Sequence, residues 1–158
     1  MRPVTRGAAP RAYTAYGQAI GDLEDRLGIY CSYCERRLPT SLAVEHVVPK
    51  SLEAALETLW DNFLLGCTNC NSVKAAQATN KRDFLWPDVD NTLVAFTYSA
   101  GGFVDVSTGL TAAVKRKASN LMKFVGLDRH EAGGRPKPAG RDKRWQQRIS
   151  RASGRRIR

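Results

Sequence analysis

Apolar residues recur every three or four positions in two segments of the chain, which is the spacing of one face of an amphipathic helix. The first segment begins at Tyr13 and is followed by Gly28, a residue type common at helix ends. The second runs from Leu110 to Val125 and is followed by Gly126. The pattern therefore predicts two helices. Leucines share the face of the tyrosines in the first helix, so that face is assigned to the core rather than to base stacking.

Short runs rich in apolar and β-branched residues predict strands between and after these elements. Residues 42–48 end at Pro49, as expected for a short strand or hairpin arm. Residues 93–98 and 103–106 alternate on either side of a Gly-Gly turn, which predicts a hairpin. A further short helix is expected over residues 71–78. The fold class predicted from these elements is α+β.

The net charge of +10 on 158 residues is concentrated at one end of the chain. Residues 129–158 hold 11 Lys and Arg against two acids, whereas residues 1–128 hold 14 basic and 13 acidic groups. We therefore expect a flexible basic arm over residues 1–12, one domain over 13–127, and a basic, flexible tail over 128–158. A basic tail suits phosphate backbones, but it is equally compatible with solubility or an acidic partner.

Two apolar features that would direct the chain to or through a membrane are missing from the sequence. No apolar run approaches the length of a membrane span, and the first residues lack the apolar stretch of a secretory signal. The sequence therefore predicts a cytoplasmic protein without a membrane partner. In that reducing compartment, cysteine pairs favour zinc over disulfides.

All four cysteines of the chain lie in two Cys-x-x-Cys pairs, Cys31–Cys34 and Cys67–Cys70. Two such pairs have the spacing found in structural sites where four thiolates bind one Zn²⁺. A redox dithiol is the weaker interpretation, because neither pair follows a βαβ pattern. We therefore predict that the zinc closes residues 35–66 into a stapled insert.

The stapled insert contains an acid–histidine dipeptide, Glu45-His46, and the two asparagines Asn62 and Asn71 lie near its end. Hydrolysis of a phosphodiester needs a base to deprotonate water and a cation to offset charge on the phosphate. His46 suits the first task because its pKa lies near neutral pH. Glu45 and Asn71 offer oxygen ligands, which favour Mg²⁺ or Mn²⁺ over a second zinc. Asn62 is predicted to orient the imidazole, or simply to cap a helix or turn over residues 63–66.

At this point the sequence resembles the HNH endonucleases, which have a ββα-metal fold. The resemblance is carried by the two Cys-x-x-Cys pairs, Glu-His-Val-Val-Pro-Lys-Ser at residues 45–51, Trp-Asp-Asn-Phe-Leu-Leu at 60–65, and Asn-x-x-Lys after the last cysteine. It implies that His46 is the general base, that Asn62 positions the loop or the imidazole, and that Asn71 is a metal ligand. Glu45 stands where the family usually has an aspartate ligand. The implied fold is a small zinc-stapled ββα-metal core with flanking helices and a C-terminal hairpin and helix.

A second resemblance covers roughly residues 13–130. Glu-His-Val-Val-Pro-Lys-Ser, Phe-Leu-Trp-Pro-Asp-Val-Asp-Asn-Thr and Val-Gly-Leu-Asp-Arg are similar to segments of the HNH nucleases of bacterial Septu-type and retron-linked anti-phage systems. This resemblance implies a role in antiviral defence and a partner ATPase. Among nucleic acids, family resemblance favours DNA over RNA.

Two alternatives stay open at the level of sequence. A noncatalytic zinc module that binds nucleic acid or a protein explains the cysteines and the basic tail as well as a nuclease does, but not the Glu45-His46 pair with two asparagines. Lys74 is expected either to touch a phosphate or to fold over the zinc loop. The candidate nucleic-acid-binding residues are Lys50, Lys74, Arg141, Lys143, Arg144 and Arg148.

Overall fold

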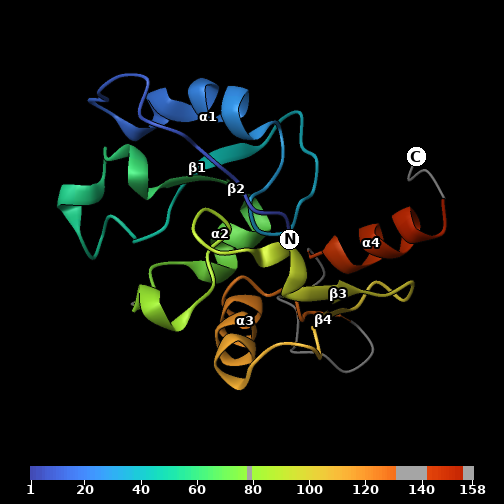
Figure 1. Cartoon of the computed structure of the whole chain (residues 1–158). Helices are drawn as coiled ribbons and strands as arrows, with labels where there is room; N and C mark the ends of the chain where they lie inside the picture. The colour runs from blue at the N-terminus through green and yellow to red at the C-terminus, as the bar shows by residue number, and fades with distance from the viewer. Residues whose placement is uncertain (78–79, 131–141, 155–158) are drawn as a thin grey trace.

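The computed structural model describes residues 1–77, 80–130 and 142–154 of the chain. Two small antiparallel sheets lie among helices, with α1 over the β1–β2 sheet and α3 on the opposite side of the molecule (Figure 1). The helices are α1 (Ile20–Leu27), α2 (Thr68–Lys74), α3 (Ala112–Phe124) and α4 (Arg144–Ala152). The strands are β1 (Leu42–His46), β2 (Phe63–Cys67), β3 (Phe96–Tyr98) and β4 (Val104–Val106). Short 3-10 turns lie at Tyr16–Ala19, Ala54–Leu56, Trp60–Asn62, Lys81–Asp83 and Thr92–Val94.

Strands β1 and β2 pair antiparallel and lead directly into α2, which gives the ββα order. The register places Leu42 opposite Cys67 and His46 opposite Phe63. All five residues of β2 are buried, because the strand is apolar on both faces and is covered on both. Gly66 is required in this strand, since a Cβ there would lie 2.9 Å from the Cβ of Glu45. The absent side chain thus lets the acid of β1 lie across the sheet.

The predicted helices form, with ends set by local chemistry. The first begins as a 3-10 turn at Tyr16 rather than at Tyr13 and ends at Gly28, whose φ of 73° is readily adopted by glycine. Helix α2 begins three residues earlier than predicted, because the Cys67 side chain caps it by accepting a hydrogen bond from the Cys70 amide. It ends at Lys74. The predicted end, Ala78, lies outside the described residues.

The predicted C-terminal hairpin and helix are confirmed, although residues 93 and 94 of the first predicted strand belong to the 3-10 turn Thr92–Val94. Strand β3 pairs antiparallel with β4, from Phe96 opposite Val106 to Tyr98 opposite Val104. Helix α3 begins after Thr111, whose hydroxyl accepts a hydrogen bond from the Val114 amide at 3.4 Å. In contrast, the helix or turn considered for residues 63–66 is wrong, because those residues form strand β2.

The two ends expected to be loose are packed in part: Met1, Val4, Asp142 and Arg144 are buried, whereas residues 7–12 are exposed. Met1 and Val4 are buried in the core, and the Val4 amide donates to the Pro87 carbonyl at 2.7 Å. Arg6 forms an ion pair of 2.9 Å with Asp88. Within the expected tail, residues 144–152 form helix α4. Apolar contacts and buried ion pairs thus hold segments that composition alone marked as flexible, and the boundaries at residues 12 and 127 stay predictions.

Within the described residues, no helix has the length and apolar character needed to cross a membrane.

Candidate functional site

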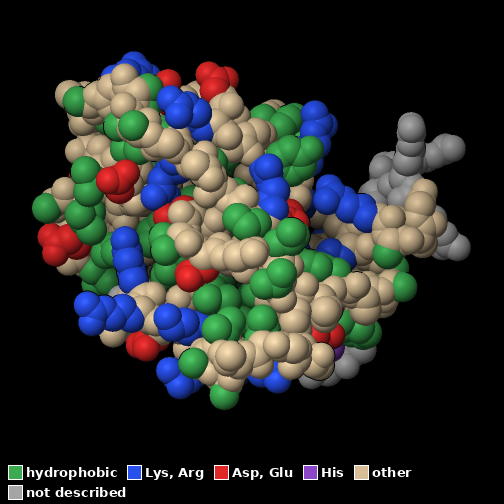
Figure 2. Space-filling view, in the orientation of Figure 1, with side chains coloured by type: hydrophobic (Ala, Val, Ile, Leu, Met, Phe, Trp, Pro, Cys, Tyr) green, Lys and Arg blue, Asp and Glu red, His purple; other side chains and the backbone are tan. Residues whose placement is uncertain are grey.

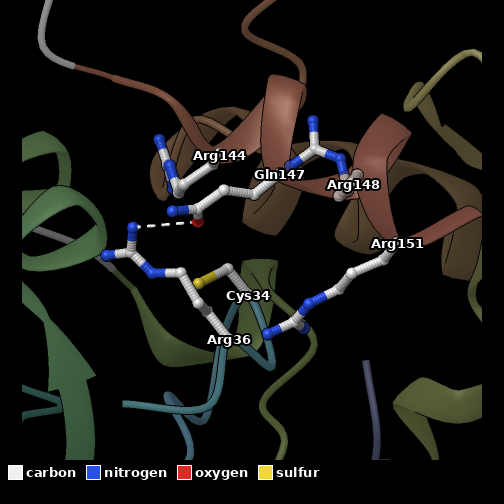
Figure 3. Close-up of a pocket in the computed structure, with 6 residues that line it drawn as sticks. All are labelled: Cys34, Arg36, Arg144, Gln147, Arg148 and Arg151. Atoms are coloured by element: carbon white, nitrogen blue, oxygen red, sulfur yellow. Dashed lines mark hydrogen bonds between the residues drawn. The ribbon is translucent and has the colours of Figure 1, made fainter. Parts of the chain in front are cut away.

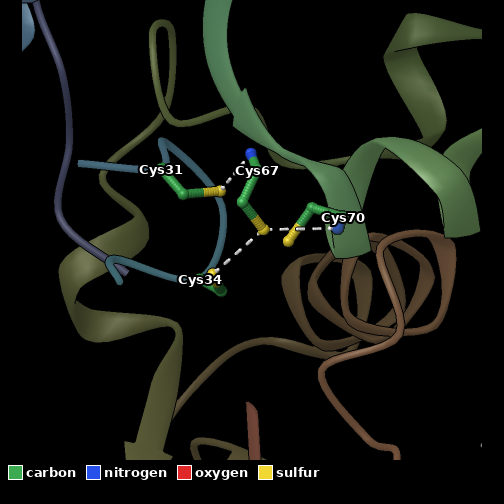
Figure 4. A group of neighbouring side chains, drawn as sticks. All are labelled: Cys31, Cys34, Cys67 and Cys70. Carbon is green, nitrogen blue, oxygen red and sulfur yellow. Dashed lines mark hydrogen bonds between the residues drawn. The ribbon is translucent and has the colours of Figure 1, made fainter. Parts of the chain in front are cut away.

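The four cysteines come together in one cluster (Figure 4). Their Sγ atoms all lie within 4.8 Å of one another, and none of the four forms a disulfide. The Cys34 and Cys67 sulfurs are 3.7 Å apart, close to the ~3.8 Å edge of a tetrahedron with Zn–S bonds of ~2.3 Å. The set of donors and its spacing therefore fit a structural zinc ion.

Backbone hydrogen bonds shape the turns that carry the sulfurs. The Cys67 amide donates to the Cys31 sulfur at 3.3 Å, and the Cys70 amide donates to the Cys67 sulfur at 3.4 Å. Hydrogen bonds to neighbouring thiols, foremost Cys31, lower the pKa of Cys67, whereas burial raises the pKa of Cys70. Four crowded thiols cannot all ionise without a cation among them, which is the condition that zinc satisfies.

One candidate phosphate-binding residue lies against this cluster instead. Arg144 is buried with 3% of its surface exposed, and its Nη1 donates to the Cys70 sulfur at 3.1 Å. Its Nε and Nη2 donate to the Asp142 carboxylate at 2.9 and 2.6 Å. The prediction that Arg144 contacts nucleic acid is therefore corrected, because its donors point into the protein.

A cleft of about 290 Å³ lies beside the end of β1 and along α2. Glu45, His46 and Asn71 all line it, together with Lys50 and Tyr16. Glu45 and His46 are neighbours on β1 and both reach this cleft, while Asn71 comes from the exposed side of α2. The structure thus brings together the residues predicted to hold a cation and the residue predicted to act as a base.

The His46 ring is fixed by a hydrogen bond and two aromatic neighbours. Its Nε2 lies 2.9 Å from the Glu57 carbonyl oxygen. Because a carbonyl only accepts hydrogen bonds, the network assigns the proton to Nε2 and leaves Nδ1 free to accept one. The rings of Tyr16 and Phe63 meet the imidazole edge to face at 5.0 and 5.4 Å. Burial lowers the pKa of His46, which favours the neutral form that a general base needs.

Glu45 is paired with Lys74 in the interior. The Lys74 ammonium lies 2.7 Å from the Glu45 carboxylate and also donates to the His46 carbonyl at 2.7 Å. Both side chains are only 2% exposed. Burial raises the pKa of Glu45, and the ammonium opposes that effect. Lys74 therefore holds the acid and the backbone of β1, and it also lines the cleft. The two roles considered for it, at a phosphate or over the zinc loop, stay predictions.

Asn62 is buried and holds a loop rather than the imidazole. The Val48 amide donates to its Oδ1 at 2.8 Å, and its Nδ2 donates to the carbonyls of Val48 and Leu56 at 2.9 and 3.3 Å. Of the two predicted alternatives, positioning the loop or the imidazole, these contacts agree with the loop, since in the described part of the chain its side chain bonds to loop backbone. The loop leads to Glu57, whose carbonyl holds the His46 ring. Asn62 is therefore linked to the His46 ring through the loop.

The remaining basic candidates differ in their exposure. Lys50 lies 2.8 Å from Glu57 and over the Tyr16 ring at the cleft, and 45% of its side chain is exposed. Lys143 is exposed, whereas Arg148 donates to the Gly102 carbonyl at 2.7 Å. Arg141 lies outside the described residues. On the face drawn in Figure 2, Lys and Arg side chains are spread over the surface with acidic side chains between them.

Sequence reasoning missed two contributors to the site. Tyr16 was assigned to the core by its spacing, yet it lines the cleft against His46. Glu57 acts through its backbone carbonyl, and no side-chain pattern identifies such a contact.

Comparison with known families agrees with this geometry. Residues 31–77 match the family model described as HNH endonuclease. The matched segment includes both cysteine pairs and the cleft residues Glu45, His46 and Asn71. No curated protein matches the chain. The fold is that of a small α+β HNH core with a four-cysteine cluster suited to zinc, accompanied by further helices and a second hairpin.

Proposed function

We propose that this protein is a metal-dependent endonuclease that hydrolyses phosphodiester bonds of nucleic acid. The observation that carries the proposal is the common cleft of Glu45, His46 and Asn71, within the segment that matches the HNH family model. A noncatalytic zinc module needs the cysteine cluster alone. It does not need a histidine whose tautomer is held by a carbonyl at the wall of an open cleft.

His46 is the residue that moves a proton. With Nε2 bonded to the Glu57 carbonyl, Nδ1 accepts the proton of a water molecule. Asn62 keeps the intervening loop in place, and Lys50 at the cleft wall offers a positive charge to a phosphate. Glu45 and Asn71 are the residues that would hold Mg²⁺ or Mn²⁺, which as a bound Lewis acid offsets charge on the reacting phosphate.

The test is a cleavage assay with supercoiled plasmid and single-stranded RNA, each with Mg²⁺ or Mn²⁺ and with EDTA. We expect cleavage of DNA that requires the divalent ion. A matched control exists in the chain, because it contains only two histidines. His130→Ala, which alters a residue that packs against Phe103 at 4.7 Å, should retain activity that His46→Ala loses. Zinc-loaded protein that binds nucleic acid but cleaves neither substrate would favour the noncatalytic module.

The preference for DNA, a cytoplasmic location and a role in anti-phage defence with a partner ATPase are further parts of the proposal. They are supported by the resemblance of residues 13–130 to Septu-type and retron-linked nucleases. Purification of the tagged protein from its native cells tests the partner: an ATPase should accompany it in stoichiometric amount. Recovery of the protein alone, from cells in which it also fails to restrict phage, would contradict the defence role.

A further inference from the structure

Arg144 connects three separate elements through one guanidinium group. At Nη1 it donates to the Cys70 sulfur of α2 and to the Val125 carbonyl, at 3.1 and 2.8 Å. At Nη2 it donates to the Gly126 carbonyl at 3.0 Å. These two carbonyls lie directly after α3, and Arg144 itself is the first residue of α4. A single side chain thus joins the beginning of α4, the end of α3 and the cysteine cluster.

The partner carboxylate fixes the orientation of this group. Asp142 accepts from both Nε and Nη2, so the guanidinium is held by a bidentate ion pair while Nη1 faces the sulfur. Four thiolates with one Zn²⁺ carry a net charge of about −2, and a buried guanidinium is the side chain best suited to donate several hydrogen bonds to such a group. The arrangement is therefore that of a hydrogen-bonding partner of a zinc ligand.

A second contact ties α4 to the other cysteine pair. Arg36, two positions after Cys34, donates to Gln147 of α4 at 3.2 Å (Figure 3). It also donates to Asn69 of α2 at 3.0 Å. Helix α4 therefore reaches both halves of the cluster. A small pocket beside Cys34 is lined by Arg36, Gln147 and Arg151 (Figure 3). Arg151 reaches this pocket from an exposed position on α4.

We propose that Arg144 is a positioning residue that docks α4 on the zinc centre and, through Cys70, fixes the start of helix α2. Cys70 is followed directly by Asn71, which lines the cleft. The C-terminal segment, which composition marks as a basic tail, thereby becomes part of the support of the catalytic cleft. The last link, to cation binding at Asn71, rests on the proposed function, whereas the link to zinc does not.

Zinc release tests the proposal without any measurement of cleavage. Zinc-loaded Arg144→Gln, Arg144→Lys and Arg151→Gln proteins are challenged with a chromogenic chelator, and hydrogen exchange is followed in residues 144–152. Loss of a residue that hydrogen bonds a metal ligand typically lowers metal affinity by ~10–100-fold, so we expect Arg144→Gln to release zinc at least ~10-fold faster. Its α4 should also lose protection. Arg144→Lys should recover part of both, and Arg151→Gln should behave like the parent protein.

Equal zinc release by Arg144→Gln and the parent would overturn the proposal, as would unchanged protection of α4. If Arg144→Gln does not fold, Asp142→Asn decides in its place, because it retains the arginine and removes the charge that orients it. That variant should show faster release and weaker α4 protection than the parent, and parental values would overturn the proposal. The dependence of cleavage on Mn²⁺ then tests the link to Asn71: Arg144→Gln should need more Mn²⁺ than Arg151→Gln. If neither parent nor variants cleave, the proposed function fails while the zinc result stands.

Discussion

Each end of helix α2 carries a residue that contacts a buried basic side chain or supplies one, but the two basic side chains differ in kind. At its beginning, Cys70 of the cysteine cluster accepts a hydrogen bond from Arg144; at its end, Lys74 pairs with Glu45 of the cleft. Both basic side chains are almost completely buried, at 3% and 2% exposed. Arg144 was predicted from sequence to bind nucleic acid, and Lys74 either to touch a phosphate or to fold over the zinc loop. In the structure each lies against a group that the proposed function assigns to a metal site, Arg144 against the Cys70 sulfur and Lys74 against the Glu45 carboxylate.

The difference lies in the kind of cation that each end uses. The planar guanidinium of Arg144 distributes its donors over a sulfur, two carbonyls and a carboxylate, which locks elements together. The ammonium of Lys74 is a point charge shared between the Glu45 carboxylate and the His46 carbonyl. The cysteine cluster therefore has a partner, Arg144, that binds several groups at once. The cleft has a single ammonium, that of Lys74, beside Glu45, the acid that would hold a cation.

The largest loss of stability is expected when one of the four clustered cysteines is replaced. Cys67→Ser removes a thiolate that lies among three other sulfurs at the end of β2. Binding of structural zinc contributes ~10–16 kcal/mol in small zinc domains, so the variant should be largely unfolded or insoluble. Circular dichroism and elemental analysis check this. Folded, active protein without zinc would contradict a structural role for the cluster.

Replacement of His46 in the cleft should abolish cleavage and leave the fold unchanged. His46→Ala removes the free Nδ1 and should lower kcat by at least ~10²-fold, the usual loss for a general base. Zinc content and nucleic-acid binding should stay at the parental level, because the imidazole contacts no sulfur within the described residues. Single-turnover cleavage with Mg²⁺ and with Mn²⁺ measures the loss. Parental rates in correctly folded protein would refute the assignment of this base.

Disruption of the buried Glu45–Lys74 ion pair should have an intermediate effect. It separates the proposed role of Glu45 as a metal ligand from its contribution to stability. Glu45→Ala leaves the Lys74 ammonium buried without its partner, which typically costs ~3–5 kcal/mol in the free energy of unfolding. The double variant Glu45→Ala/Lys74→Met should regain most of that stability and yet remain inactive. Urea denaturation of both proteins checks the first statement, and cleavage assays check the second. Equal stability of the single and double variants would show that the pair does not matter to the fold.

The pH dependence of cleavage tests the surroundings of His46. Burial lowers its pKa, so the neutral base persists to lower pH than for an exposed histidine, and the midpoint of the rising limb of kcat/KM should lie below the ordinary histidine value of ~6.5. Tyr16→Ala opens one side of the ring. Because a solvated imidazolium is easier to form, the rising limb should move to higher pH. A rising limb at the same pH in both proteins would argue against burial as the cause.

The smallest effect is expected at the exposed basic residues of the C-terminal segment. Lys143→Gln should reduce the slope of log K against log salt by at most ~1, since one lysine neutralises one phosphate. Arg144 serves as the contrast, because it is buried and should not change the slope by a phosphate contact. Filter binding over a salt series measures both. An unchanged slope in Lys143→Gln assigns that residue to solubility or to a protein partner.

Much of the cleft followed from local sequence. The dipeptide Glu45-His46 fell on a strand, as its β-branched neighbours predicted, and the match to the HNH family model covers it. Asn71 reached the same cleft because it directly follows Cys70 within α2, the helix that begins after Cys67. The contact of Asn62 was harder to predict, since a buried amide has several donors and acceptors and only the fold decides which backbone groups come near it.

The sequence by itself determined the cysteine cluster, since two Cys-x-x-Cys pairs have the spacing of a four-thiolate metal site. It also determined the α+β class, because hydrophobic periodicity is a local property. Only the tertiary structure decided what the basic residues do. Arg144 and Cys70 are 74 positions apart, and Lys74 and the His46 carbonyl are 28 apart. The residues next to a Lys or Arg in the sequence do not indicate which distant group it will contact. Its burial beside such a group is therefore determined only by the packing of the whole chain.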